Sequence, residues 1–326
     1  MSIFITGGTG FIGRYTTDLL SKSSHQLKLL IRKTSNTSIL GKTNFTAVEG
    51  DLRDKKSLLE GMKDCDSVIN IAAHYTLWEP DNRIYSELNI NGTKNVMECA
   101  LETGIKKIVH ISTAGIYGKP KEDPFTEESQ VGPVQYSEYF RTKYEGEKIV
   151  WDLFKQKGLP VVVIYPVCVL GAGDTKASGR YISDLINRKL PATVLNNHIF
   201  TFVYVKDVAQ AIVNALEKEN NIGQKYLVGN YRYTWEEINK MISEISGIPL
   251  PKFRLPDSIT MMNAYILTGL ANIIKKPPLW GMSIDQMKVM KVGFNVDGSK
   301  AERELGIKYT PIRTALEEAI NSIISN

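Results

Sequence analysis

The chain has 326 residues, of which 43% are hydrophobic and 23% are charged, a composition that is ordinary for a globular enzyme. Its formal net charge of +5 is too mild to indicate a nucleic-acid partner, for which a clustered basic face would be expected. The cysteines, Cys65, Cys99 and Cys168, are widely spaced and form no C-x-x-C pair. We therefore expect neither a disulfide framework nor a metal site, and a reducing cytoplasm fits this pattern.

The sequence opens inside a strand-and-turn pattern, MSIFITGG, so we expect no signal or transit peptide before it. The longest apolar stretch, residues 258–274, contains Thr260, Asn263, Thr268 and Asn272, and it is shorter than the ~20 apolar residues of a membrane-spanning helix. We expect no transmembrane span and interpret this stretch as a buried or pocket-covering helix. The alternative is a helix that lies at a membrane interface.

Short β-branched runs alternate with longer helical patterns through the first two thirds of the chain, which is typical of a parallel sheet with crossover helices. Strands are expected at residues 2–6, 27–32, 45–49, 67–71, 107–112, 160–165 and 200–205. Helices are expected at residues 11–21, 57–61, 83–103 and 207–218.

The pattern loosens after Gly171, where Pro, Gly and aromatic residues become scattered. Helices are still expected near 234–246, 256–274 and 311–324, joined by irregular segments. We infer an α/β unit formed by residues 1–169 and 198–230, and a smaller, discontinuous unit formed by 170–197 and 231–326.

A glycine-rich segment, Thr6 to Gly13, follows the first expected strand and directly precedes the first expected helix. Glycine is needed where the backbone turns sharply and approaches a pyrophosphate without a Cβ in the way. The helix start at Phe11 offers free N–H groups and the positive end of its dipole to phosphates. The larger unit is therefore predicted to be a Rossmann-type, doubly wound parallel sheet that binds a dinucleotide. The contacts expected from this loop are Gly7, Thr9, Gly10, Phe11, Ile12 and Gly13.

The end of the second expected strand bears on the choice between NAD and NADP. An acidic residue about 20 residues after the loop would bind the ribose 2′-hydroxyl of NAD, whereas an arginine accommodates a 2′-phosphate. Here Arg32 and Lys33 stand at this point with no acid nearby, so NADP(H) is favoured over NAD(H). Asp51 and Leu52 close the third strand, where a carboxylate can accept a hydrogen bond from the adenine amino group.

Tyr139 and Lys143 are four residues apart at the start of a helical stretch, which places both side chains on one helix face. A tyrosine with an ordinary pKa near ~10 is a poor acid–base group at neutral pH. A neighbouring ammonium and an oxidised nicotinamide would both favour its phenolate. Thr113, which follows the fifth strand, adds a hydroxyl that can hold a substrate oxygen.

These motifs together resemble an extended short-chain dehydrogenase/reductase along nearly the whole chain. The matching segments are residues 6–13, 50–54, 68–73, 89–93, 112–118, Tyr139 with Lys143, and 205–209. The resemblance implies a smaller C-terminal substrate domain and the catalytic set Thr113, Tyr139 and Lys143. It also implies cofactor contacts by Tyr139 and Lys143 and by Ile71, Ala72, Ala73, Asn89, Pro166 and Val169.

Within that family the chain is most similar to the dihydroflavonol-reductase-like branch, and in particular to hopanoid-associated sugar epimerase homologues. Residues 74–81, 178–191 and 300–306 carry this likeness. Two positions depart from the family pattern. Asn70 stands where the family often has His, and Phe200 stands where nucleotide-sugar epimerases usually place an Arg that holds the diphosphate.

The leading hypothesis is reversible hydride transfer between NADP(H) and a ketone or secondary alcohol, with Tyr139 as general acid. The alternatives are a nucleotide-sugar epimerase or dehydratase, and a non-catalytic NADP-sensing protein. The substrate is a small carbonyl compound or sugar, and pairing with a second copy of the chain is left open. The candidates on the substrate side are His74, Trp78, Tyr136, Ser178 and Arg180.

Overall fold

The computed structural model describes residues 1–325 and is built around a seven-stranded sheet in the order β10-β6-β5-β4-β1-β2-β3. Every neighbouring pair in this sheet is parallel, and the order reverses direction between β1 and β4. The expected doubly wound parallel sheet is therefore confirmed. Its strands are β1 (Ser2–Thr6), β2 (Gln26–Ile31), β3 (Thr46–Glu49), β4 (Ser67–Asn70), β5 (Lys107–Ile111), β6 (Val161–Pro166) and β10 (Lys225–Val228).

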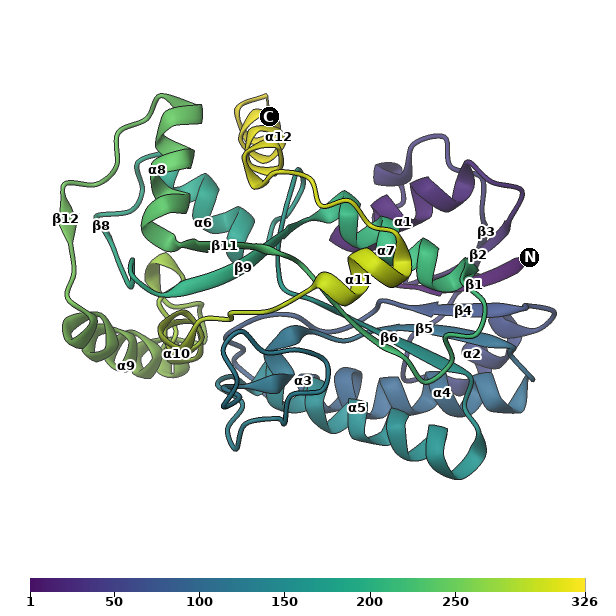
Figure 1. The fold of residues 1–326 in the computed structure, drawn as a ribbon. Coiled ribbons are helices and arrows are strands. Elements are labelled where there is room, and N and C mark those ends of the chain that lie inside the picture. The colour runs from purple at the N-terminus through teal and green to yellow at the C-terminus, as the bar shows by residue number, and fades with distance from the viewer. Residues whose placement is uncertain (326) are drawn as a thin grey trace.

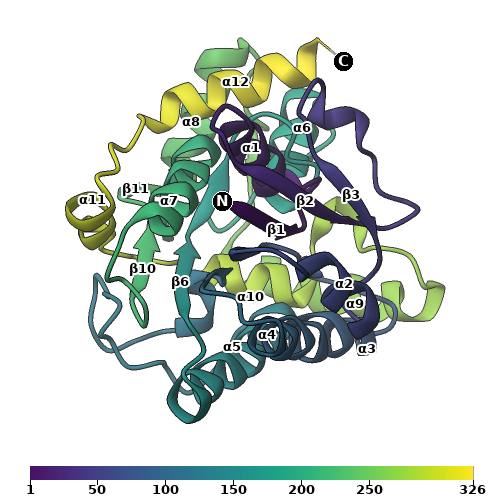
Figure 2. The same ribbon diagram turned by 90° about the vertical axis from the view of Figure 1, so that its right-hand side faces the viewer.

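Helices cover both faces of this sheet, as Figure 2 shows. On one face lie α1 (Phe11–Ser21) and α7 (Val205–Glu217), and on the other lie α2 (Lys55–Met62), α4 (Thr93–Glu102) and α5 (Glu138–Lys157). A central strand with both faces covered must be apolar along its whole length. Accordingly, every residue of β6 is buried.

The single helix expected over residues 83–103 is instead three pieces. A short α3 (Arg83–Tyr85) leads into a π-helical segment, η2 (Ser86–Gly92), and only then into α4. The wide turn lies against α5, where a Cβ on Gly146 would come within 2.3 Å of the Asn89 carbonyl oxygen. This close approach is a tertiary contact, which the local helical periodicity does not reveal. π-Turns of this kind often occur next to functional sites.

A second group of elements gathers beyond one end of the large sheet, on the left in Figure 1. It contains helices that were expected, together with short strands of two to six residues that form two small sheets. These elements include β7 (Cys168–Leu170), α6 (Ala177–Ile186), β8 (Ala192–Thr193), β9 (Ile199–Tyr204), β11 (Tyr231–Thr234), α8 (Trp235–Ser246), β12 (Phe253–Arg254), α9 (Asp257–Ile274), α10 (Ile284–Val292) and α12 (Ile312–Ile324). A further helix, α11 (Ser299–Leu305), returns to pack beside β10 and α7.

The expectation that the apolar stretch 258–274 is buried is wrong for most of α9. The helix buries only Thr260, Ala264 and Ala271, and most of its large apolar side chains are exposed, although Met261 and Leu267 pack against the core. Sequence periodicity could not choose the inward face, because apolar residues occur on all sides of the helix. Within residues 1–325, no helix is long and apolar enough to cross a bilayer.

Candidate active site

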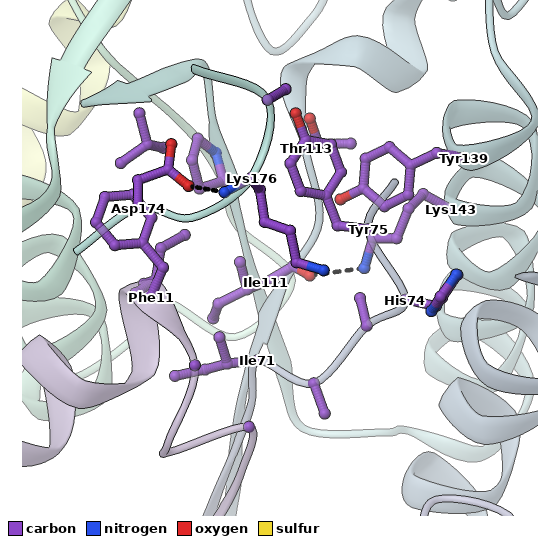
Figure 3. Close-up of a pocket in the computed structure, with 18 of the residues that line it drawn as sticks. Phe11, Ile71, His74, Tyr75, Ile111, Thr113, Tyr139, Lys143, Asp174 and Lys176 are labelled. Atoms are coloured by element: carbon purple, nitrogen blue, oxygen red, sulfur yellow. Dashed lines mark hydrogen bonds between the residues drawn. The ribbon is translucent and has the colours of Figure 1, made fainter. Parts of the chain in front are cut away.

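A cavity of about 640 Å³ opens at the carboxyl ends of the central strands, where the strand order reverses. This is the place where open α/β sheets bind ligands, and the volume suits a cofactor with a small substrate. The lining runs from the glycine loop before α1, past the ends of β4 and β5, to residues of α6 and α10. Figure 3 shows the central part of this cavity.

The glycine loop has the shape that a pyrophosphate requires. Gly7 has a φ of +73°, and a Cβ there would lie 2.6 Å from the backbone nitrogen of Ala72. A Cβ on Gly13 would lie 2.0 Å from the carbonyl oxygen of Gly7. No side chain caps α1, whose N-cap is Gly10, so its first N–H groups remain available to an anion. Among the loop residues expected to contact a dinucleotide, Gly7, Thr9, Gly10, Phe11 and Ile12 line the cavity, whereas Gly13 only packs behind the loop.

The far end of the cavity contains Arg32 and a short polar turn. Thr34, Ser35 and Asn36 also line it, and the backbone N–H of Arg32 donates to the Ser35 hydroxyl at 3.0 Å. Lys33 does not line the cavity, because its side chain points toward Glu49, with an Nζ–Oε1 distance of 3.5 Å. Only the first of the two expected cations is therefore placed to meet a cofactor here.

Asp51 and Leu52 also line the cavity, just after β3, the strand that pairs with β2. The Asp51 carboxylate accepts from Arg53 Nε at 2.7 Å. This hydrogen bond, together with the charge of Arg53, lowers the pKa of Asp51, so its carboxylate is ionised at neutral pH. It can therefore still accept a hydrogen bond from a bound adenine.

Tyr139, Lys143 and Thr113 converge on the middle of the cavity, as Figure 3 shows. Ser137 caps the N-terminus of α5 by accepting from the Phe140 N–H at 3.2 Å, which fixes the first turn that carries Tyr139. One turn later, Lys143 Nζ donates to the carbonyl oxygen of Ile111 at 2.8 Å. The Thr113 hydroxyl accepts from the Gly115 N–H at 3.2 Å, which leaves its own hydrogen to be donated to a ligand.

Burial shifts the pKa values of the two titratable groups in opposite directions. It raises the pKa of Tyr139, because the phenolate would be desolvated. It lowers the pKa of Lys143 to about 8, an effect that the nearby Glu147 carboxylate partly offsets. At neutral pH the tyrosine is therefore a protonated phenol that lies ready to donate.

Asn89 holds the segment after β4 in place by hydrogen bonds to the backbone of His74. The His74 N–H donates to Asn89 Oδ1 at 2.8 Å, and Asn89 Nδ2 donates to the His74 carbonyl oxygen at 3.1 Å. Asn89 does not line the cavity, whereas Ile71, Ala72, Ala73 and His74 do. The His74 ring in turn lies 2.8 Å from the Glu79 carboxylate. Asn89 is thus placed to position this wall of the site.

The remaining candidates fall into two groups. Ser178 lines the main cavity, as do Pro166 and Val169. Trp78 and Arg180 line a second cavity of about 500 Å³, and Arg180 Nε lies 3.6 Å from Asp184. Tyr136 lines neither of these cavities. The two cavities adjoin, because they share the lining residues Tyr75, Leu77, Lys176, Ala177, Tyr181, Gln286 and Met290.

Residues outside the expected catalytic, cofactor and substrate sets also lie in the main cavity. Tyr75 packs edge-on against Tyr139 with 4.8 Å between ring centroids. Lys176 extends into the cavity in Figure 3, and its backbone N–H donates to Asp174 at 2.8 Å. Tyr75 directly follows a residue that was selected, so its position was a usable signal. Asp174 and Lys176 belong to an irregular loop with no such signal.

At position 200, where an arginine was expected, the phenylalanine belongs to an aromatic cluster. Phe200 is buried, and its ring packs edge-on against Phe294 at 5.5 Å and Trp235 at 5.7 Å. All three rings line the main cavity. The other departure, Asn70, is buried and accepts from the Thr6 hydroxyl at 2.6 Å, so it joins β4 to β1. The first departure therefore changes the character of the cavity wall, and the second is structural.

Comparisons with known proteins agree with this architecture. A model of the NAD dependent epimerase/dehydratase family matches residues 3–229. A putative dihydroflavonol 4-reductase of Synechocystis is 29% identical and covers 98% of this chain and 93% of its own length. Sterol demethylase protein B of Methylococcus capsulatus is 26% identical, with 98% and 97% covered. The crystal structure of gox2253 matches with a TM-score of 0.84 at 30% identity, over 99% of this chain and 98% of that chain. The chain therefore belongs to the NAD dependent epimerase/dehydratase family of extended short-chain dehydrogenases/reductases.

Proposed function

We propose that this enzyme transfers a hydride reversibly between NADP(H) and an apolar ketone, aldehyde or secondary alcohol. The observation that carries the proposal is the pairing, in one cavity, of the Thr113, Tyr139 and Lys143 groups with a wall of aromatic and aliphatic side chains. In this scheme residues 1–169 and 198–230 bind the cofactor, and residues 170–197 and 231–326 form the substrate side, to which Phe200 of β9 also contributes its ring.

In the direction of reduction, NADPH held at the glycine loop would supply the hydride that the carbonyl carbon receives. Tyr139 donates its phenolic proton to the carbonyl oxygen, and the Thr113 hydroxyl holds that oxygen by a hydrogen bond. The Lys143 ammonium favours the phenolate that remains, and it also binds the nicotinamide ribose. Addition of one hydride and one proton to the C=O bond gives the alcohol, and a proton from solvent restores the tyrosine.

The preference for NADP(H) is assigned to Arg32 with the hydroxyls of Thr34 and Ser35. A guanidinium beside hydroxyl donors can hold a 2′-phosphate by charge-assisted hydrogen bonds. The apolar character of the substrate is assigned to Phe200, Trp235 and Phe294. The likeness to the Synechocystis relative described as a putative dihydroflavonol 4-reductase supports a carbonyl substrate.

The test is a spectrophotometric assay of NADPH oxidation with a panel of hydrophobic ketones and aldehydes, run in parallel with NADH. We expect several members of the panel to stimulate NADPH oxidation, and NADH to be the poorer donor. If no carbonyl compound stimulates oxidation of either cofactor, the proposal is wrong.

The second candidate is a nucleotide-sugar epimerase or dehydratase, in which the cofactor stays bound and is regenerated in each cycle. Lys176, which lines both cavities, and Arg180, which lines the second, are the cations that favour this candidate. Both lie in α6 or just before it, and Arg180 is already engaged by Asp184. Interconversion of a UDP- or GDP-sugar without net change in NADPH would identify this reaction.

A further inference from the structure

The outer edge of the second group of elements carries an unusual concentration of exposed apolar side chains. Of the sixteen large hydrophobic residues that are exposed within residues 1–325, ten fall between residues 253 and 280. We call this surface the apolar face. It consists of Phe253, Ile259, Met262, Tyr265, Ile266, Leu270, Ile273, Ile274, Leu279 and Trp280. Most of these residues belong to β12 and α9, which lie along one edge of the molecule in Figure 1.

Helix α9 has the reverse of the pattern expected for a helix at a water-exposed surface. Such a helix normally buries large apolar residues and exposes charges. Here the buried positions are the small residues Thr260, Ala264 and Ala271, while Ile273 is 79% exposed and Tyr265 is 61% exposed. No charged residue occurs from 258 to 274. Exposure of this face to water is therefore unfavourable, and an apolar partner that covers it would be favourable.

The charges around the face indicate which medium this is. Lys252 stands beside Phe253, and Lys275 and Lys276 follow the end of α9. All three are exposed, and within residues 1–325 none forms a direct ion pair, although the charge of Lys275 reaches the Asp81 carboxylate. Arg254 is held by Glu236 at 3.3 Å, and Asp257 lies 3.1 Å from the His198 ring. A symmetric contact between two copies would bring the unpaired lysines of both copies to one interface, which is unfavourable. An anionic lipid surface complements them.

The composition of the face also suits a lipid headgroup layer. Tyr265 and Trp280 have an apolar ring and a polar tip, a combination that favours the boundary between water and acyl chains. An α-helix of 18 residues is roughly 27 Å long, so α9 offers an extended surface that can lie in the plane of the membrane. It does not qualify as a membrane-spanning helix.

The apolar face also adjoins the route to the catalytic groups. Asn263, Lys275 and Trp280 line the second cavity, which shares Tyr75 and Met290 with the main one. Trp78, which also lines the second cavity, donates its indole N–H to Asn272 of α9 at 2.9 Å. A chain of lining residues thus connects the apolar face with Tyr139.

We propose that the apolar face docks onto the surface of an anionic bilayer, and that the second cavity admits the substrate from that bilayer. The docking is independent of the reaction catalysed. The delivery of substrate rests on the proposed function, since it requires an apolar carbonyl compound.

The docking is tested by flotation of the full chain with vesicles of phosphatidylcholine and phosphatidylglycerol in equal parts. We expect the protein to float with these vesicles, and to float less with phosphatidylcholine alone or at high salt. A protein that stays at the bottom of the gradient with the anionic vesicles at low salt would overturn the proposal.

A pair of matched double variants separates the apolar face from general surface hydrophobicity. Ile266→Glu with Ile273→Glu places two charges on the face, at positions that line neither cavity. Ile222→Glu with Ile324→Glu makes the same changes at exposed positions elsewhere. The first variant is expected to lose about tenfold or more in vesicle partitioning, and the control to bind as the parent does. Equal losses in both variants would overturn the assignment. It would also be overturned if neither the parent nor the first variant bound vesicles, and the parent were a dimer that the two substitutions dissociate.

The substrate route is tested with two apolar carbonyl compounds, one water-soluble and one that partitions into vesicles. The Ile266→Glu, Ile273→Glu variant is expected to keep its turnover of the soluble compound and to lose turnover of the vesicle-bound one. Equal turnover of the vesicle-bound compound by parent and variant would overturn the proposed route. If the parent reduces neither compound but still floats, the proposed function fails and the docking stands.

Discussion

The two ends of the catalytic cavity are built from different parts of the polypeptide. At the cofactor end the shape comes from the backbone, since Gly7 and Gly13 are packed so closely that a Cβ would collide with main-chain atoms. At the substrate end the shape comes from side chains, including the edge-on rings of Phe200, Trp235 and Phe294. A backbone-built end tolerates little change, whereas a side-chain-built end can be altered one residue at a time. This difference explains how one family binds a common cofactor and acts on different substrates.

The catalytic groups lie between the two ends, and their removal should have the largest effect. Tyr139→Phe is expected to lower turnover by about 10² or more with nearly unchanged cofactor affinity, because it removes a general acid that does not shape the phosphate loop. Steady-state kinetics and a cofactor titration measure the two quantities. The control is Tyr136→Phe, which lines neither cavity and should keep most of the activity. Full activity in the Tyr139→Phe variant would remove this residue from the mechanism.

Lys143 also lies between the two ends, and the free-energy cost of burying its charge depends on pH. Burial lowers its pKa from 10.5 to about 8, so between these values the unfolded chain binds more protons than the folded one. Folding therefore becomes more favourable as pH rises through that window. Below the window, the full cost of burying the Lys143 charge is present. As pH rises from ~7 to ~10.5, the parent should gain on the order of 3 kcal/mol of folding stability that the Lys143→Met variant does not gain.

Denaturant unfolding without cofactor at several pH values measures this difference. The loss of the hydrogen bond to Ile111 shifts the whole curve but adds no pH dependence of this kind. A constant difference between parent and variant across the range would show that Lys143 is not desolvated as the structure indicates.

The addition of one methyl group tests how little change the glycine loop tolerates. Gly13→Ala should cost roughly 1–3 kcal/mol of stability, since the new Cβ meets the Gly7 carbonyl oxygen. Because that shift distorts the phosphate loop, cofactor affinity should fall as well. Gly269→Ala is the matched control: it is also helical, its Cβ would meet nothing within 4 Å, and it should be neutral or stabilising by about 0.5–1 kcal/mol. Equal behaviour of the two variants would break the comparison.

Cofactor preference gives the smallest expected effect. Arg32→Asp should reduce the ratio of NADPH to NADH affinity by about tenfold or more, as a charge-assisted contact is replaced by repulsion. Lys33→Asp should change this ratio much less, because Lys33 points toward Glu49 and not into the cavity. Fluorescence titration of both cofactors measures the ratio. Equal affinity of the parent for NADPH and NADH would defeat the assignment.

The strand, glycine loop and helix at the cofactor end could be predicted because their signals are local. The glycine loop, the strand before it and the helix after it are adjacent in the chain, and the structure has them at Ser2–Thr6 and Phe11–Ser21 as expected. The choice between Arg32 and Lys33 was harder, since successive residues at a strand end point to opposite sides. Only the position of Glu49 on the neighbouring strand reveals which one faces the cavity.

The substrate end was less predictable because its signals are not local. Strands β8 and β12 have only two residues each, too few for any alternating pattern. Helix α10 contributes Gln286 and Met290 to both cavities, yet it contains no motif. In α9 the apolar residues surround the helix, so the exposed face emerged only from tertiary packing.

The most direct test of the central claim, that the side-chain-built end takes an apolar carbonyl compound, is calorimetry of nucleotide sugars with the NADP⁺-saturated protein. The buried Phe200 stands where a diphosphate would need an arginine, so we expect UDP- and GDP-sugars to bind no more tightly than millimolar. A hydrophobic ketone that supports NADPH oxidation should bind more tightly than either sugar. Micromolar binding of a UDP- or GDP-sugar would contradict the account and favour the epimerase reaction, with Arg180 the first residue to replace.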